Sequence, residues 1–292
     1  MRFLLALMLA LSACGSAEEP LTKRPDGALR IATYNVHYIV LTKATGAWSV
    51  GDWERRKGPL DLAFKALDAD VVGFQEMESF SNGSDGSVNL ARDWLDERNS
   101  DWGVAASGDW QAFPSTQPIF YRKTRLEAVD QGWFFFSETP DVIYSRTFNG
   151  SYPAFASWAQ FEERETGKRF RVVNFHFDYS SGSNQRRSAM LVRDRVKPWT
   201  DAGERVFVIG DINDDWDSVP AQVMGKAGVT FLPVEGSTYH WNRGINLTSA
   251  VDHIAYSKGA RVVGGPVVVR KKFDGEWPTD HYPVVADFAL TD

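Results

Sequence analysis

The stretch RVFVIGDIND (residues 205–214) indicates the fold class of this 292-residue chain. Residues 206–210 form a short apolar run of the length and composition of a buried strand. The run ends directly in Asp211, and Asn213 projects from the same side two residues later. Asp211 alone would also suit a helix N-cap. The apolar run before it and Asn213 after it favour a functional site at the end of a strand.

The same arrangement recurs along the chain. Short β-rich runs occupy residues 29–36, 70–76, 117–122, 156–163, 169–177, 251–257, 260–270 and 282–290. Sites in α/β proteins are assembled where strands end. Many of these runs begin or end in side chains suited to metal or phosphate chemistry, namely Asn35, His37, Gln75, Glu76, His176, Asp178, Asp252, His253, Asp280 and His281.

Composition and periodicity predict one large α/β domain over residues 28–292. Helical patterns at 55–68, 89–99 and 183–199 lie between the strands, and strands mixed with helices indicate this class. The chain is 43% apolar and 24% charged, which excludes a disordered chain, a collagen and a coiled coil. The net charge of −6 argues against a protein that binds nucleic acid mainly by electrostatics.

The N-terminus has the layout of a secretory signal, which we place at residues 1–13. The segment LSAC (residues 11–14) resembles a bacterial lipobox, which implies lipid attachment at Cys14. Cys14 is the only cysteine, so an intrachain disulfide and a cysteine-built zinc site are excluded. Residues 14–27 read as a flexible tether. We expect a lipid-anchored protein on the periplasmic or external side of a bacterial cell envelope. The alternative is a plain signal peptide with an incidental cysteine.

Six motifs together resemble the endonuclease/exonuclease/phosphatase superfamily, in the order of that family. They are TYNVH (33–37), FQEME (74–78), NFHFD (174–178), GDIND (210–214), VDHI (251–254) and TDHYPV (279–284). FFFSETPD (134–141) further resembles a bacterial branch of uncertain substrate. The resemblance implies a four-layer α/β sandwich, with two packed mixed or antiparallel sheets flanked by helices. It also implies a metal-dependent phosphoesterase.

Phosphate ester hydrolysis needs the charge on the phosphoryl oxygens neutralised and a water activated. A hard cation such as Mg²⁺, or Mn²⁺, prefers oxygen ligands and takes one or two carboxylates. Glu76 is the principal candidate ligand. The resemblance places Asn35 beside it, and Asp280 would support a second metal position.

The resemblance also implies catalytic roles. Asp211 would be the general base, although a role as metal ligand stays open. Asn213 would hold the phosphate, and His281 would contact a phosphoryl oxygen or the water. Asp252 would orient His281, because a carboxylate that accepts an imidazole N–H fixes the tautomer. As an imidazolium, His176 would stabilise the transition state or protonate the leaving oxygen. Tyr121 matches a family tyrosine near the phosphate.

Some positions depart from the family pattern. His37 stands where many nucleases carry Asp or Asn, which weakens an oxygen-only second metal site. Ala154 stands where the bacterial branch often has Arg, so a phosphate contact is missing or comes from elsewhere, for example Arg146. Arg186 and Arg187 begin a helix after the His176 strand and are candidate substrate-binding residues. Their alternative reading is a solvated helix face.

The expected function is divalent-metal-dependent hydrolysis of a phosphoester by a monomer. Nucleic acid, a phosphorylated metabolite and a lipid head group are all compatible substrates. The alternative is a non-catalytic surface binding protein on the same fold. That alternative predicts erosion of the metal and base positions, all of which are intact in the sequence.

Overall fold

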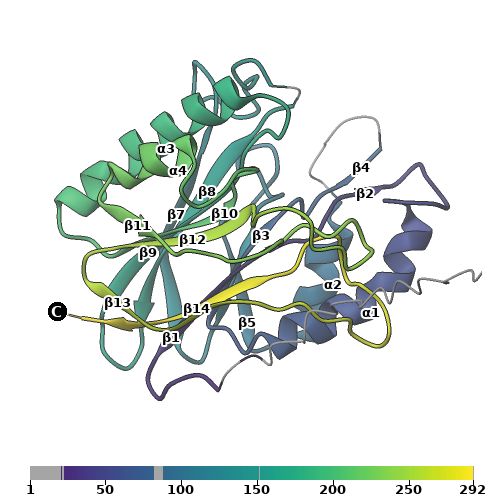
Figure 1. The fold of residues 1–292 in the computed structure, drawn as a ribbon, viewed down its shortest axis with the longest axis horizontal. Coiled ribbons are helices and arrows are strands. Elements are labelled where there is room, and N and C mark those ends of the chain that lie inside the picture. The colour runs from purple at the N-terminus through teal and green to yellow at the C-terminus, as the bar shows by residue number, and fades with distance from the viewer. Residues whose placement is uncertain (1–20, 22, 82–87, 151, 292) are drawn as a thin grey trace, which may run out of the picture.

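Two six-stranded sheets lie face to face in the computed structural model, which describes residues 21, 23–81, 88–150 and 152–291 (Figure 1). The predicted signal peptide, Cys14 and most of the predicted tether lie outside these residues. The strands of the first sheet are, in spatial order, β13 (Ala260–Val268), β14 (Val284–Leu290), β1 (Leu29–Asn35), β3 (Val71–Gln75), β6 (Ile119–Arg122) and β5 (Trp102–Ala105).

The second sheet repeats the plan of the first. Its strands are, in spatial order, β11 (Val229–Phe231), β12 (Asp252–Ser257), β10 (Val206–Asp211), β9 (Arg169–His176), β8 (Phe155–Glu163) and β7 (Leu126–Phe135). Each sheet contains one parallel pair, β1 with β3 and β9 with β10, and its other pairs are antiparallel. A small parallel pair, β2 (Ile39–Val40) and β4 (Ser79–Phe80), stands apart from both.

Helices cover the outer faces of the sandwich, as Figure 1 shows. α1 (Val50–Ala66) and α2 (Leu90–Arg98) pack on the first sheet, and α3 (Gly182–Asp201) and α4 (Val219–Gly225) pack on the second. A third apolar cluster fills the space between the sheets. The predicted four-layer sandwich is therefore confirmed. No helix in the described part of the chain has the length and apolar character needed to cross a bilayer.

α1 shows how the sequence determines the buried face of a helix, and its first residue differs from the predicted one. The predicted face of Leu60, Phe64 and Leu67 is buried against the first sheet. The helix begins at Val50 rather than at residue 55, because Ser49 caps it by accepting a hydrogen bond from the backbone N–H of Asp52 (3.0 Å). Local capping thus extends the helix beyond the apolar pattern.

The topology explains why the functional side chains meet. The carboxyl ends of the parallel pairs in both sheets lie at one edge of the sandwich. β12 and β14 run antiparallel to their neighbours, so their first residues lie at that same edge. We call it the site edge. Asn35, Gln75, His176 and Asp211 end their strands there, and Asp252 begins one.

Candidate active site

Asn35 joins the two sheets at the site edge. Its Nδ2 donates to Glu76 Oε1 (3.0 Å) on the first sheet and to Asp211 Oδ2 (3.1 Å) on the second. Its Oδ1 accepts a hydrogen bond from the backbone N–H of His37 (3.1 Å), which fixes the orientation of the amide. Asn35 is therefore a donor between two carboxylates in this structure.

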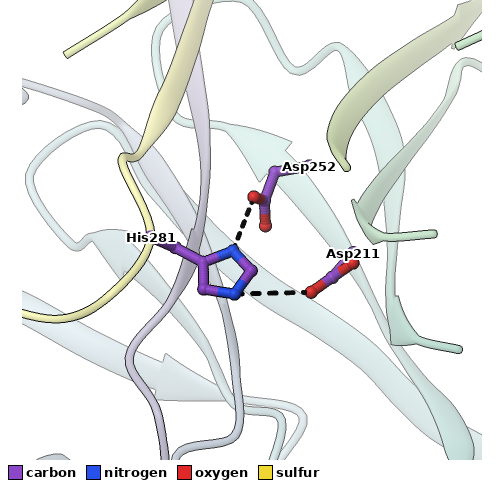
Figure 2. Close-up of side chains that lie close together, drawn as sticks. All are labelled: Asp211, Asp252 and His281. Atoms are coloured by element: carbon purple, nitrogen blue, oxygen red, sulfur yellow. Dashed lines mark hydrogen bonds and ion pairs between the residues drawn. The ribbon is translucent and has the colours of Figure 1, made fainter. Parts of the chain in front are cut away.

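His281 lies between two aspartates (Figure 2). Its Nδ1 is 2.8 Å from Asp252 Oδ2, and its Nε2 is 3.9 Å from Asp211 Oδ2. Burial lowers the pKa of His281, but the carboxylates of Asp252 and Asp211 outweigh that effect and raise the pKa to about 10. The ring is therefore protonated at neutral pH, with Nδ1–H donated to Asp252, in the orientation expected for that pair.

Asp211 is the centre of the site. Besides Asn35, its carboxylate accepts the backbone N–H of Asn213 (2.8 Å) and lies 3.7 Å from His176 Nε2. Burial, together with the charge of Asp252, raises the pKa of Asp211 to about 6. The group is thus ionised at neutral pH but more basic than an exposed aspartate, which suits a general base.

Asn213 holds His176. Its backbone is in the left-handed region (φ +55°), and its Nδ2 donates to the carbonyl oxygen of Phe177 (2.8 Å). The same nitrogen lies 3.1 Å from His176 Nε2. This contact, together with the bond to Phe177, positions Asn213 to orient the His176 ring.

Four carboxylates gather at this edge. Glu76 follows β3 with a φ of +53°, and its side chain is 22% exposed. Burial, with the charge of Glu76, raises the pKa of Asp280. Among the described residues, no lysine or arginine forms an ion pair with Glu76, Asp211, Asp252 or Asp280, whereas the buried Asp70 and Asp287 each have an arginine partner.

The donor set at the site edge fits a hard divalent cation. Oxygen ligands predominate, and the buried Oδ1 of Asp252 has no hydrogen-bond partner in the described structure. Ligand atoms of Asp211, Asp252 and His281 all lie within 4.8 Å of one another. Glu76, joined to Asp211 through Asn35, lies on the more open side. A cation would relieve the unpaired negative charge.

A buried polar network supports the site from below. Gln75 Nε2 donates across the sandwich to Asn174 Oδ1 (2.6 Å) and, within its own sheet, to Thr33 Oγ1 (3.0 Å). Asn174 Nδ2 then donates to the carbonyl oxygens of Phe74 (2.8 Å) and Gln117 (3.2 Å). Apolar contacts alone tolerate sliding of one sheet over the other, whereas these directional bonds set the position of Glu76 relative to His176.

The structure contradicts the prediction for Tyr121. In the pairing of β6 with β3, Tyr121 lies opposite Val71, at the end of β3 remote from Glu76. Its ring packs between the sheets, 5.2 Å from the ring of Phe161, beneath Gly103. The match of Tyr121 to a family tyrosine rested on resemblance, and the register of β6 on β3 places it away from the site edge.

The predicted arginines do not join the site. Arg187 forms an ion pair with Glu138, and its guanidinium lies 3.9 Å from the centre of the Phe148 ring. On α3 it is Gln185 that faces the site, where its Nε2 donates to the carbonyl oxygen of Asn213 (3.3 Å). Arg186 is exposed and has no contact with the site residues among those described. The helix turns Arg187 away from the site and toward Glu138.

The structure also places the residues at which the sequence departs from the family pattern. His37 is buried, and its Nε2 lies 3.8 Å from Asp52 of α1. Burial, together with Arg56, lowers its pKa well below the ordinary value. Ala154 packs into the apolar cluster under α3, so no side chain reaches the site from that position. Arg146 is exposed.

Sequence reasoning missed the tyrosines around the site. The ring of Tyr239 lies 5.0 Å from the ring of His281, and that of Tyr152 lies 6.4 Å from the ring of His176. Burial and the charges of Glu76 and Asp280 raise the pKa of Tyr38. These tyrosines come from separate segments of the chain, so only the fold brings them together. His240 stacks on Tyr282 at 4.0 Å.

These features define an α/β sandwich with an acidic and imidazole-bearing centre at its strand ends. The model of the Endonuclease/Exonuclease/phosphatase family matches residues 32–281, and the chain belongs to that family. Members generally depend on divalent metals, and the carboxylates of the buried group of Asp211, Asp252 and His281 could hold one.

Solved structures share the fold. A family member from Bacteroides thetaiotaomicron superposes with a TM-score of 0.73 at 23% identity, covering 91% of this chain and 98% of that one. A mannosyl-6-phosphatase from Bacteroides thetaiotaomicron gives 0.71 at 22% identity, covering 90% and 100%. TDP2 from D. rerio, complexed with a single-strand DNA product, gives 0.61 at 18% identity, covering 91% and 100%. A search of curated proteins found no match.

Proposed function

We propose that this protein is a divalent-metal-dependent phosphoester hydrolase. The observation that carries the proposal is the convergence on Asp211 of groups from both sheets. Asn35, His176 and His281 each approach its Oδ2, at 3.1, 3.7 and 3.9 Å respectively. A non-catalytic binding protein would have no need of carboxylates such as Asp211 and Asp280, which are buried without a lysine or arginine partner among the described residues and have raised pKa values.

Each side chain has a role in this proposal. Asp211 accepts a proton from the attacking water, because its pKa near 6 leaves it ionised yet basic at neutral pH. His281 carries a positive charge and turns Nε2–H toward the site, where it stabilises negative charge on the phosphoryl group. Asp252 keeps that ring charged and oriented. The distance of 3.9 Å between Asp211 and His281 leaves both groups free for a bound molecule.

Mg²⁺, or Mn²⁺, is the proposed cofactor. Glu76 is the carboxylate best placed to hold it, with Asp280 as a further oxygen donor, which leaves Asp211 to act as the base. When bound, the cation supplies Lewis-acid neutralisation of charge on the phosphoryl oxygens. The residues of the chain itself position the water and the ester.

The comparisons support a phosphate ester as substrate without choosing among classes. The mannosyl-6-phosphatase supports a phosphorylated sugar, and TDP2 supports nucleic acid. The net charge of −6 argues against a long polyanion. We therefore propose a small phosphate ester acted on by a monomer.

The proposed location is the outer face of a bacterial cytoplasmic or outer membrane, with lipid attached at Cys14. Its support is the N-terminal sequence described above. Growth of the expressing bacterium with a radioactive fatty acid should label the full chain, and Cys14→Ala should remove the label. Retention of the label in Cys14→Ala would refute the anchor.

The test of function is hydrolysis of a panel of phosphomonoesters and phosphodiesters. We expect turnover with Mg²⁺ or Mn²⁺ that chelator abolishes. His281→Ala should remove most of it, whereas Tyr121→Phe, a matched control remote from the site, should retain it. Absence of metal-dependent turnover across the panel, or equal loss in both variants, would contradict the proposal.

A further inference from the structure

Three aromatic rings form a continuous row from the site to the surface. The ring of Tyr239 lies 5.0 Å from that of His281 and 4.7 Å from that of Trp241, tilted by 52° and 57°. Exposure rises along the row, since His281 is 7% exposed, Tyr239 is half-buried and Trp241 is 38% exposed. A backbone bridge between Tyr239 and His281 fixes the inner part of the row. We call Tyr239 and Trp241 the aromatic platform.

The chain adopts an unfavourable backbone conformation to present this platform. Trp241 and Asn242 both have a φ of +55°, a region that bulky residues rarely occupy. Such residues persist only where the surroundings hold them, and they concentrate at functional sites. Trp241 packs its ring on Tyr239 yet stays 38% exposed, so burial alone does not account for this conformation. The conformation therefore points to a role at the protein surface.

His240 is the anchor that holds the turn. It is buried, and its ring stacks 4.0 Å from Tyr282 and lies 4.7 Å from Trp277. Its backbone N–H donates to the carbonyl oxygen of Asp280 (2.8 Å), and its Nδ1 accepts from the backbone N–H of Gly244 (3.3 Å). The platform is thus tied directly to the segment that carries Asp280 and His281.

The chemistry of the platform indicates what it would accept. Tyr239 packs on His281 and Trp241 continues the row outward, so both present uncharged aromatic faces beside the site. Aromatic faces bind the flat side of uncharged rings such as those of sugars and bases.

We propose that Tyr239 and Trp241 form a subsite that stacks on the uncharged ring of the substrate beyond its phosphate, either a sugar or a nucleoside. This inference rests on the proposed function, because it takes the reacting phosphate to lie beside His281. It narrows the substrate to ring-bearing phosphate esters, with the ring placed on the side of β12 and β14.

The test compares a ring-bearing ligand with a ring-less one by titration calorimetry. Glucose 6-phosphate and adenosine 5′-monophosphate are the ring-bearing probes, and glycerol 3-phosphate is the ring-less probe. Asp211→Asn, loaded with Mn²⁺, serves as the background so that binding is measured without turnover. We expect Trp241→Gly to weaken the ring-bearing ligand on the order of tenfold and the ring-less one far less. Trp241→Phe should restore the preference.

Folding is controlled in the same variants. Glycine accepts positive φ freely, so Trp241→Gly should unfold at the same temperature as the parent or higher. Equal weakening of all ligands by Trp241→Gly, or no preference for rings in the parent, would overturn the platform. Both readouts are binding constants, so failure of hydrolysis would refute the proposed function without deciding this point. The better of the two ring-bearing probes identifies the sugar or the nucleoside as the source.

Discussion

Carboxylates at the two edges of the sandwich differ in their charged partners. At the edge remote from the site, Asp70 accepts from Arg24 Nη1, Arg125 Nη1 and the backbone N–H of Arg30, each at 2.8 Å. Asp287 takes both arms of the Arg30 guanidinium, at 2.7 and 2.8 Å. At the site edge, four carboxylates lie without a lysine or arginine partner among the described residues.

This contrast distinguishes the carboxylates that stabilise the fold from those that can take part in a reaction. An arginine that neutralises a buried carboxylate makes it inert, because the pair satisfies its charge and its lone pairs. A carboxylate without such a partner keeps its capacity for a proton or a cation. The remote edge therefore serves stability, and the site edge serves function.

The largest expected effect comes from Asp211→Asn. Removing the proposed base should lower kcat by about 10²–10⁴-fold, while thermal stability stays the same or rises because a buried charge is gone. Steady-state kinetics and calorimetric melting measure the two quantities. Loss of stability in proportion to activity would place Asp211 with the structural acids instead.

Arg30→Met tests the remote edge. It leaves Asp287 buried and unpaired, so the free energy of unfolding should fall by about 3–5 kcal/mol, with kcat per folded molecule unchanged. Urea unfolding measures the loss, and the double variant Arg30→Met/Asp287→Leu should recover most of it. A fall in kcat without a fall in stability would break the distinction between the edges.

The pH dependence of stability, measured without metal, tests the charged groups at the site edge. The folded pKa of His281, about 10, exceeds its ordinary value of 6.5, so its contribution is complete below 6.5 and is lost as pH rises through 10. Melting temperature in chelator should therefore decline over this interval. Asp252→Asn should flatten the decline, and an unchanged slope in that variant would count against the assignment.

The smallest effect belongs to Arg187→Ala. Arg187 is bound to exposed Glu138 and lies away from the site, so turnover should be unchanged. An exposed ion pair contributes about 0–1 kcal/mol, which sets the expected loss in urea unfolding. A raised KM would instead show that Arg187 contributes to substrate binding.

The sequence was sufficient wherever function depends on where a strand ends. Asp211 and Glu76 lie at strand ends as expected, because an apolar run stops just before each of them. Tyr121 was matched to the family by resemblance, and long-range register, which the sequence does not show, places it at the far end of β3. Arg187 pairs with Glu138 because the packing of α3 sets the rotation of the helix. The strained backbone of the aromatic platform appears only in three dimensions.

The pairing of β1 with β14 determines when the active site is completed during synthesis. These strands are joined along five residue pairs, although about 250 positions of chain separate them. During synthesis, neither His281 nor the strand that seats it exists until nearly the whole domain has emerged. Because distant pairings of this kind form late, we expect the nascent polypeptide to have no hydrolytic activity until the pairing is complete. Proteolytic fragments lacking that strand should likewise be inert.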